Sequence, residues 1–535
     1  MRFLVTILLA IVAVVPAVAQ KKIGKGQASG SFESTSIYYM DDKKLGAAPE
    51  DHFGSNNYMK VDYANGRFSA GLQANAFLPV LQGYDDLADG FKFYLASKYI
   101  QWRDKNYEIL VGDIFDQYGN GLIYRSFEDR QLGFNNSIEG VRGAYSFGRY
   151  VSLKGMYGRP RLNTDYAKSW VRGADLVVSL ADICGIQEKA TLSIEGSYVN
   201  RFQKLTLGDN YDKIRFEETG MNTPNLNMYS GRLNFGWAGL SLRGEYVHKS
   251  KDLAPNAEKA ASGSAIFGEV GYSYDSFSII ATYRQLNNMA TRSSLYELGM
   301  ANAINYLPAL TRQYTYMLAN LNPYQVAADG EMGGQVDICY SLRSKENRYR
   351  YWNFHANFST FYTLKKTQTD IGKRRVMWRD INFDIERQWS KKLKTILLFS
   401  RQEISPTHGF QKEMYASNIF VGDVTYKFDR KKSLRVEVQY LYADRQNGTY
   451  NYEGDWVAGL VEFSLAPRWS FFVQDMYNIH KTKTNYYSGG FSYTYNRTRV
   501  QLSYGRNRAG YVCSGGVCRF SPAYTGVSLV LTSSF

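Results

Sequence analysis

The sequence predicts an all-β fold: a transmembrane antiparallel β-barrel of about 24 strands, with roughly 20–26 compatible with the turn pattern. Three observations carry this prediction. Apolar and polar residues alternate with a period of two along most of the chain, short turns alternate with long polar connections, and aromatic residues make up 15% of the composition. In such a barrel half of each strand faces a wet lumen, and amphipathic rings gather at both membrane interfaces.

The N-terminal segment has the three parts of a secretory signal. Arg2 precedes an apolar run from Phe3 to Val15, and Ala17 and Ala19 stand at the positions before a cleavage site. The run is shorter than the roughly 20 apolar residues that a membrane-spanning helix needs. We therefore expect residues 1–19 to be removed during export through the Sec pathway, and residues 20–535 to form the barrel.

Period-two alternation appears in segments spread over the whole chain. Leu434, Val436 and Val438 fall on one face of such a segment, and Arg435 and Glu437 fall on the other. Because successive side chains of a strand point to opposite faces, each segment has an apolar side and a polar side. Repeated segments of about ten residues with this pattern are typical of outer-membrane barrels.

Short and long connections alternate between these segments. Alternation begins near Ser29, so we expect no N-terminal plug domain, and residues 112–137 and 287–334 are the most notable long loops. Short turns at one end and long loops at the other match periplasmic turns and external loops. Tight turns are predicted at nine polar or small dipeptides: Asn65-Gly66, Lys105-Asn106, Gly148-Arg149, Ala238-Gly239, Asp275-Ser276, Ser390-Lys391, Arg430-Lys431, Pro467-Arg468 and Asn496-Arg497.

The first long loop combines glycines, aromatic rings and charges of both signs. In a lumen, opposed basic and acidic groups would create a transverse field at a constriction, as rings of charge do in selectivity filters. The alternative is an ordinary external loop with solvated charges. The candidate constriction residues are Asp113, Gln117, Tyr118, Arg125, Glu128, Asp129 and Arg130.

The second long loop is too apolar for a flexible connection. Long connections of this kind are usually functional or pack against something. We expect residues 287–334 to fold into the lumen, cap the barrel or meet a partner.

Both loops contain a distinctive motif. Residues 112–122 match GD-x-F-x-QYG-x-GL, and residues 308–316 match PALT-x-Q-x-TY, followed by Pro323 and Tyr324. In these motifs the chain resembles a family of uncharacterised Gram-negative outer-membrane β-barrel proteins. The resemblance implies the location and the fold, and it implies no known activity.

The polar faces of the segments carry charges of both signs. Charges are costly in hydrocarbon, so these groups are expected to face water or one another, as ion pairs across a wet lumen. The net charge of +15 is compatible with anionic solutes, with anionic lipid headgroups or with scattered loop charge. The candidate lumen charges are Lys60, Arg67, Arg142, Lys154, Arg243, Glu245, Asp384, Glu386, Arg435, Glu437 and Arg499.

Cysteine and histidine give little sign of chemistry. Cys513 and Cys518 bracket four residues of the last long loop, and an oxidising compartment favours a disulfide between them. The sequence does not determine whether Cys184 and Cys339 pair with each other. The five histidines are dispersed, without His-x-x-x-His or Cys-x-x-Cys spacing, so no metal site, cofactor or catalytic residue is expected. The chain is not expected to be an enzyme, nor to bind nucleotide or nucleic acid.

Two functions fit these predictions. One is a porin-like passive channel for small polar or charged solutes, because barrels beyond about 16 strands enclose a channel unless it is filled. The other is a loop-plugged barrel that serves in the interaction or assembly of an outer-membrane protein complex. Both place the chain in the cell outer membrane, in contact with lipid and lipopolysaccharide, and the second also requires other outer-membrane proteins.

Overall fold

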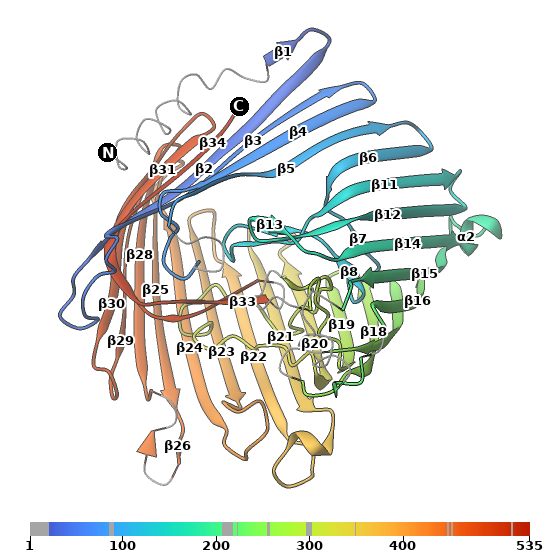
Figure 1. The fold of residues 1–535 in the computed structure, drawn as a ribbon. Helices are drawn as coiled ribbons and strands as arrows, with labels where there is room; N and C mark the ends of the chain where they lie inside the picture. Colours follow the sequence, from blue (N-terminus) through green and yellow to red (C-terminus); the bar gives the residue numbers. More distant parts are fainter. Residues whose placement is uncertain are drawn as a thin grey trace.

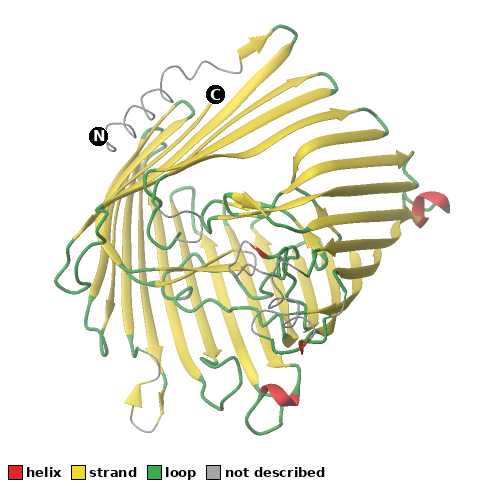
Figure 2. Cartoon of the chain, viewed as in Figure 1, coloured by secondary structure: helices red, strands yellow, loops and turns green. Residues whose placement is uncertain are grey.

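The chain forms one closed wall of 24 antiparallel strands (Figures 1 and 2). The predicted fold class and the predicted number of strands are therefore confirmed. The expected signal segment lies outside the described residues, so its cleavage stays a prediction. The computed structural model describes residues 21–84, 90–205, 218–221, 223–253, 257–295, 302–347, 349–446, 449–450, 453–514 and 517–535.

Neighbouring wall strands follow one another in chain order. The first twelve are β2 (Gly26–Met40), β3 (Phe53–Asn65), β4 (Phe68–Phe77), β5 (Lys92–Arg103), β6 (Tyr107–Ile114), β11 (Ile138–Phe147), β12 (Val151–Leu162), β14 (Trp170–Ser179), β15 (Ala190–Phe202), β16 (Asn225–Trp237), β17 (Leu240–Asp252) and β18 (Ala261–Tyr274). The other twelve are β19 (Phe277–Asn287), β20 (Gly330–Arg343), β21 (Tyr351–Thr363), β22 (Val376–Gln388), β23 (Leu393–Ile404), β24 (Tyr415–Lys427), β25 (Lys432–Ala443), β28 (Trp456–Leu465), β29 (Trp469–Asn478), β30 (Asn485–Tyr495), β31 (Thr498–Asn507) and β34 (Tyr524–Ser534).

Short elements complete the described structure. They are β1 (Lys21–Ile23), β7 (Gln117–Tyr118), β8 (Tyr124–Arg125), β9 (Glu128–Asp129), β10 (Phe134–Asn135), β13 (Asp165–Tyr166), β26 (Arg445–Gln446), β27 (Thr449–Tyr450), β32 (Gly510–Ser514), β33 (Val517–Ser521), α2 (Leu180–Ile183) and η2 (Lys366–Gln368). Among the described residues, no helix has the length and apolar character needed to cross a membrane.

All nine predicted dipeptides lie at short connections between paired wall strands. Several of these turns need a residue with positive φ, because only that backbone twist matches the twist of the two strands it joins. Gly66 has a φ of 58° and Asn496 a φ of 53°, and glycine and asparagine tolerate this region best. Local turn chemistry thus specifies one end of the barrel.

The first and last wall strands close the barrel. β2 pairs with β34 from Ser31 opposite Ser534 to Met40 opposite Thr525. The backbone of Phe535 adds two hydrogen bonds to Gly30, of 2.8 and 2.9 Å. A Cβ atom on Gly30 would lie 2.4 Å from the Phe535 ring, so glycine leaves the space that the terminal ring occupies.

The junction between β5 and β6 has the shortest ladder in the wall. The two strands pair only between Tyr99–Arg103 and Glu108–Gly112, and they then diverge (Figure 1). Beyond the ladder, side-chain contacts link β5 to β6 and to the next wall strand, β11. The backbone N–H of Lys98 donates to Asp113 at 2.9 Å, and the Lys98 ammonium pairs with Glu139 of β11.

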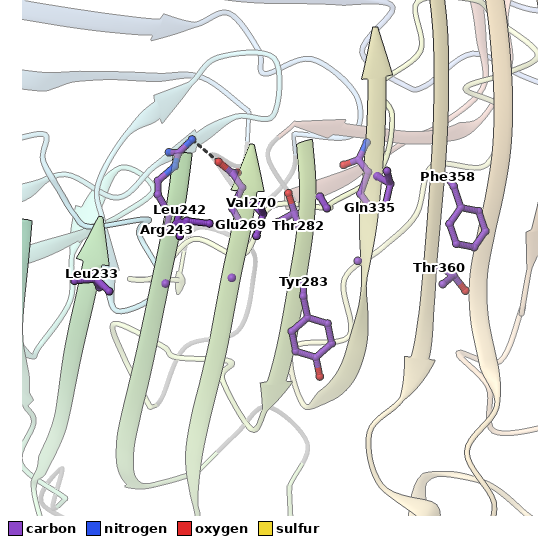
Figure 3. A pocket seen from close by; sticks show the side chains of 15 residues that line it. Leu233, Leu242, Arg243, Glu269, Val270, Thr282, Tyr283, Gln335, Phe358 and Thr360 are labelled. Carbon is purple, nitrogen blue, oxygen red and sulfur yellow. Dashed lines mark ion pairs between the residues drawn. The ribbon is translucent and has the colours of Figure 1, made fainter. Parts of the chain in front are cut away.

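The outer face of the wall is apolar. Many of its large side chains are exposed, as in Leu233, Val270, Tyr283 and Phe358. A depression of about 660 Å³ lies on this face between β16 and β21, and Figure 3 shows side chains that line it. Three glycines in the same cross-strand row leave its lining without side chains at their positions: Gly244, Gly268 and Gly334.

Candidate functional site

Residues 115–137, here called the first inner loop, fold back into the barrel (Figure 1). Tyr118, Ile123 and Tyr124 are fully buried. They form one apolar cluster with inward side chains of the wall from β12 to β19, such as Met156 and Val247. Apolar side chains leave water when they pack in this way, which fixes the loop against the wall. This segment is not an ordinary external loop.

The structure places the first three candidate constriction residues in this packing. Asp113 is buried at the end of β6, where it accepts from Ser137 at 3.1 Å and pairs with Arg161 at 3.3 Å. The Gln117 side chain donates to the carbonyl of Gly119 at 2.7 Å. Tyr118 is part of the apolar cluster.

The charged candidates tie the first inner loop to its surroundings. The Arg130 guanidinium pairs with Glu33 of β2 at 2.7 Å and with Glu128 at 3.3 Å. Glu128 also accepts from Gln73 of β4 at 2.6 Å, and Asp129 accepts from the backbone of Leu132 at 3.1 Å. These contacts span from the loop to β2 and β4, so a transverse field stays a prediction.

Arg125 holds the two long loops together. Its guanidinium lies 4.6 Å from the ring centre of Phe127 and 3.8 Å from that of Tyr306. Its backbone N–H donates to the carbonyl of Ile304 at 3.0 Å. A cation over an aromatic face contributes about 0.5–2 kcal/mol, with the larger values at desolvated positions. Arg125 therefore acts as a clamp between the loops.

Residues 288–295 and 302–329, here called the second inner loop, also enter the barrel. Its first part lies on the first inner loop: Asn305 donates to the carbonyl of Leu122 at 3.2 Å, and Asn136 donates to the carbonyl of Ala303 at 2.8 Å. The next part crosses to the opposite wall.

Three residues of the second inner loop make polar bonds to the wall. Arg312 pairs with Asp384 of β22 at 2.5 Å, and the Tyr314 hydroxyl donates to Asp380 of β22 at 2.7 Å. The backbone N–H of Leu318 donates to Gln439 of β25 at 2.8 Å. Residues 312–318 thus form a polar edge toward this wall.

Buried ionic contacts anchor the end of the second inner loop. Arg284 of β19 is 1% exposed and pairs with Glu331 of β20 at 2.7 Å, and it also donates to the carbonyl of Pro308. The Tyr324 hydroxyl donates to the other oxygen of Glu331 at 2.7 Å. Burial, and next the nearby Glu331 charge, raise the pKa of Tyr324 well above its ordinary value, which keeps this hydroxyl protonated.

The hairpin of β32 and β33, here called the closing hairpin, reaches across the loop end of the barrel (Figure 1). Cys513 and Cys518 are joined by a disulfide within it. Val512 and Val517 pack against the buried Leu132 and Phe134 of the first inner loop. The Arg519 guanidinium donates to the carbonyls of Gly83 and Gln131, at 3.0 and 3.4 Å. Three segments distant in the sequence thus form one layer.

Toward the short-turn end, the lumen wall carries ion pairs between neighbouring positions. Lys60 pairs with Asp62 at 3.3 Å, and Arg243 with Glu269 at 2.5 Å; the Lys60 and Arg243 side chains are 41% and 51% exposed. The other candidate lumen charges have the following partners: Arg142 with Glu108 and Asp116; Lys154 with Asp116; Glu245 with Asn120 and Ser230; Glu386 with Tyr351 and Lys394; Arg435 with Asp423 and Glu437.

Two candidate lumen charges, Arg67 and Arg499, make no ion pair on the lumen wall among the contacts described for them. Arg67 lies at the turn between β3 and β4, where it pairs with Asp104 of the next turn at 2.7 Å. It belongs to the rim of the barrel. Arg499 donates to Gln501 at 3.1 Å and is exposed.

Among the wall carboxylates that bind the second inner loop, the prediction includes Asp384 but not Asp380 or Asp423. Asp380 lies 66 residues from Tyr314 in the sequence, and Asp423 lies 107 residues from Tyr316. Each occupies an inward position of its strand, which alternation predicts. Which loop residue contacts each carboxylate depends on the path of the second inner loop, and no local sequence pattern predicts that path.

The whole sequence, residues 1–535, matches one family profile. The chain belongs to a family of unknown function (DUF6029). This agrees with the resemblance to a family without known activity, whereas the two loop motifs stay a prediction. No curated protein matches this DUF6029 chain significantly in sequence.

Solved outer-membrane structures resemble the fold of the DUF6029 chain. An E. coli P pilus tip assembly intermediate, PapC-PapD-PapK-PapG, matches with 10% identity and a TM-score of 0.50, covering 97% of this chain and 62% of that one. The translocation pore of the P pilus usher PapC has 8% identity, 95% and 99% coverage and a TM-score of 0.45. The siderophore receptor PirA from Pseudomonas aeruginosa has 8% identity, 95% and 80% coverage and a TM-score of 0.44. A 24-strand barrel of this kind implies an outer-membrane location.

Proposed function

We propose that the protein is an outer-membrane channel for small polar or charged solutes, with its passage restricted by the inner loops. The observation that carries the proposal is the charged lumen wall below the loop layer. There, charged side chains such as Lys60 and Arg243 remain substantially exposed, although they lie on the inner face of the strands. Charges in this position require water, and a water-filled lumen is what a diffusion channel needs.

The charge pattern supports a channel with little preference for one sign. Basic and acidic residues lie beside each other on the wall, as in the pairs of Lys60 with Asp62 and Lys394 with Glu386. The electric fields of two adjacent opposite charges largely cancel at a distance, and water and salt screen the field that remains. Restriction by size at the loop layer is then the main filter.

Single-channel recording in a planar bilayer tests the proposal. The folded wild-type barrel is compared with a variant in which a short glycine-serine linker replaces residues 308–327. Steady openings of the wild type, with larger conductance in the shortened variant, support a restricted channel. A silent wild type together with a conducting variant overturns the channel proposal and shows that the loops plug the lumen.

A second candidate function is a loop-plugged barrel that binds another outer-membrane protein. The observation that favours it is the continuous layer of the two inner loops and the closing hairpin, which carries exposed rings at Tyr511 and Phe520. Aromatic side chains on rigid surfaces are common at protein interfaces. Mild-detergent extraction of the native membrane tests it: a stoichiometric partner is expected, and release of a solitary barrel from the wild-type membrane contradicts it.

We also propose that the apolar outer face contacts outer-membrane lipid and lipopolysaccharide. The depression over Gly244, Gly268 and Gly334 has the apolar lining that an acyl chain requires (Figure 3). The outer-membrane location also requires export, so we propose that signal peptidase removes residues 1–19. N-terminal sequencing of the protein from outer membranes tests this cleavage. An intact Met1 in that sample would contradict cleavage.

A further inference from the structure

Three metal-ligating side chains of different types meet on the lumen face of β20 and β21. Asp337, Cys339 and His355 each place one ligand atom within 4.8 Å of the other two. Cys339 lies opposite His355 in the strand register, and Asp337 lies two residues earlier on the same face. His355 Nε2 is 2.8 Å from Asp337 Oδ2, and Cys339 Sγ is 3.6 Å from Asp337 Oδ1.

A fourth side chain orients the imidazole. Asp384 lies opposite His355 on β22, with its Oδ2 atom 2.9 Å from His355 Nδ1. Histidines that bind a metal usually donate their second ring N–H to a carboxylate, which leaves Nε2 for the metal. Asp384 is held in turn by Arg312 of the second inner loop. The cluster therefore contains three possible metal ligands and a carboxylate, Asp384, that positions the ligand His355.

A cation in the lumen can reach this cluster. Tyr340 of β20 and Phe358 of β21 are exposed on the outer face. Because successive side chains of a strand point to opposite faces, the adjacent Cys339 and Asn357 point into the lumen. The Asp337 side chain is 34% exposed and that of His355 is 20% exposed. Cys339 is a free cysteine, so its sulfur is available as a ligand.

We propose that Asp337, Cys339 and His355 form a lumenal site for a borderline-soft divalent cation, best matched by Zn²⁺. Thiolate and imidazole ligands favour Zn²⁺ over Mg²⁺ and Ca²⁺, which prefer oxygen ligands. Binding releases the thiol proton of Cys339 and any proton between His355 Nε2 and Asp337 to solvent, and a water fills the fourth position. His355 Nε2 and Asp337 Oδ2, now 2.8 Å apart, need to separate by about 0.5 Å so that each can lie about 2.0–2.1 Å from a tetrahedral zinc ion.

Cobalt titration of the folded full-length barrel, after treatment with a chelator, tests this site. We expect one equivalent of Co²⁺ to bind with a thiolate-to-cobalt charge-transfer band, which Zn²⁺ displaces. Cys339→Ser should remove the band, and the matched control Cys184→Ser, which changes the other free cysteine, should keep it. Absence of binding to the folded wild type, or a band that persists in Cys339→Ser, overturns the proposal.

Two further measurements separate ligands from packing. Zn²⁺ should slow the reaction of Cys339 with a maleimide and leave the reaction of Cys184 unchanged; equal effects on both thiols contradict the site. Asp384→Asn should weaken metal affinity about 10–100-fold while the charge-transfer band remains, because Asp384 positions the ligand His355. An unchanged affinity would remove Asp384 from the site. None of these readouts depends on whether the barrel conducts.

Discussion

The two inner loops pack against different parts of the same wall. The first inner loop buries Tyr118, Ile123 and Tyr124 in an apolar cluster with the wall from β12 to β19. The second inner loop buries Tyr316, Leu318 and Leu321 in another apolar cluster, with β23, β24, β25 and β28, and it adds polar bonds to β22 and β25. Because the two clusters share no residue, we expect each loop to open when its own cluster is disturbed.

The largest effect is expected when Arg284 is replaced by Met. Glu331 would then be a buried carboxylate without its guanidinium partner, which costs about 3–5 kcal/mol. Native-state hydrogen exchange should show the second inner loop opening at lower free energy, while residues 115–137 change less. In the matched control, Arg284→Met with Glu331→Gln, much of the loss should be recovered because the unpaired charge is gone. Equal loosening of both loops would contradict the distinction between them.

Replacing Ile123 with Ala should loosen the first inner loop by about 3 kcal/mol, because it leaves a cavity beside fully buried neighbours. Residues 302–307 should loosen with it, since they lie on this loop. The control is Leu318→Ala, which removes a buried side chain from the second inner loop. Hydrogen exchange should locate its effect at residues 312–321. The comparison fails if both variants loosen the same residues.

A smaller loss, about 2 kcal/mol, is expected for Tyr314→Phe. This change removes one hydrogen bond to the Asp380 carboxylate and keeps the ring. If the polar edge restrains the second inner loop, single-channel recordings should show more frequent current fluctuations. Tyr511→Phe, at an exposed ring of the closing hairpin, is the control and should leave the recordings unchanged. Identical recordings from both variants would mean that this edge does not restrain the loop.

The smallest effect, about 1 kcal/mol, is expected for Arg125→Lys, which keeps the charge and loses the planar contact with Phe127 and Tyr306. Arg125→Gln then distinguishes a clamp from a constriction. As a clamp, Arg125 affects the stability of the contact between the loops and not the ion preference. A shift toward cations in Arg125→Gln, measured from reversal potentials under a salt gradient, would instead support the transverse-field hypothesis.

Much of the candidate site was within reach of the sequence, but its contacts were not. The two loop segments and most of the lumen charges follow from alternation and from their unusual composition. The partners of those residues do not, as Tyr314 with Asp380 and Cys339 with His355 illustrate. A period of two assigns a side chain to a face, and it does not specify which residue of another strand lies opposite.

The sequence by itself determined the barrel, its approximate strand number and its nine tight turns, because these depend on local alternation and on turn chemistry over a few residues. Only the tertiary structure decided that the long loops turn inward, that Arg125 and Arg130 bind rings and the wall, and that Asp337, Cys339 and His355 converge. The physical reason is that loop direction and cross-strand proximity result from packing between segments far apart in the chain. Those contacts exist only once the barrel has closed.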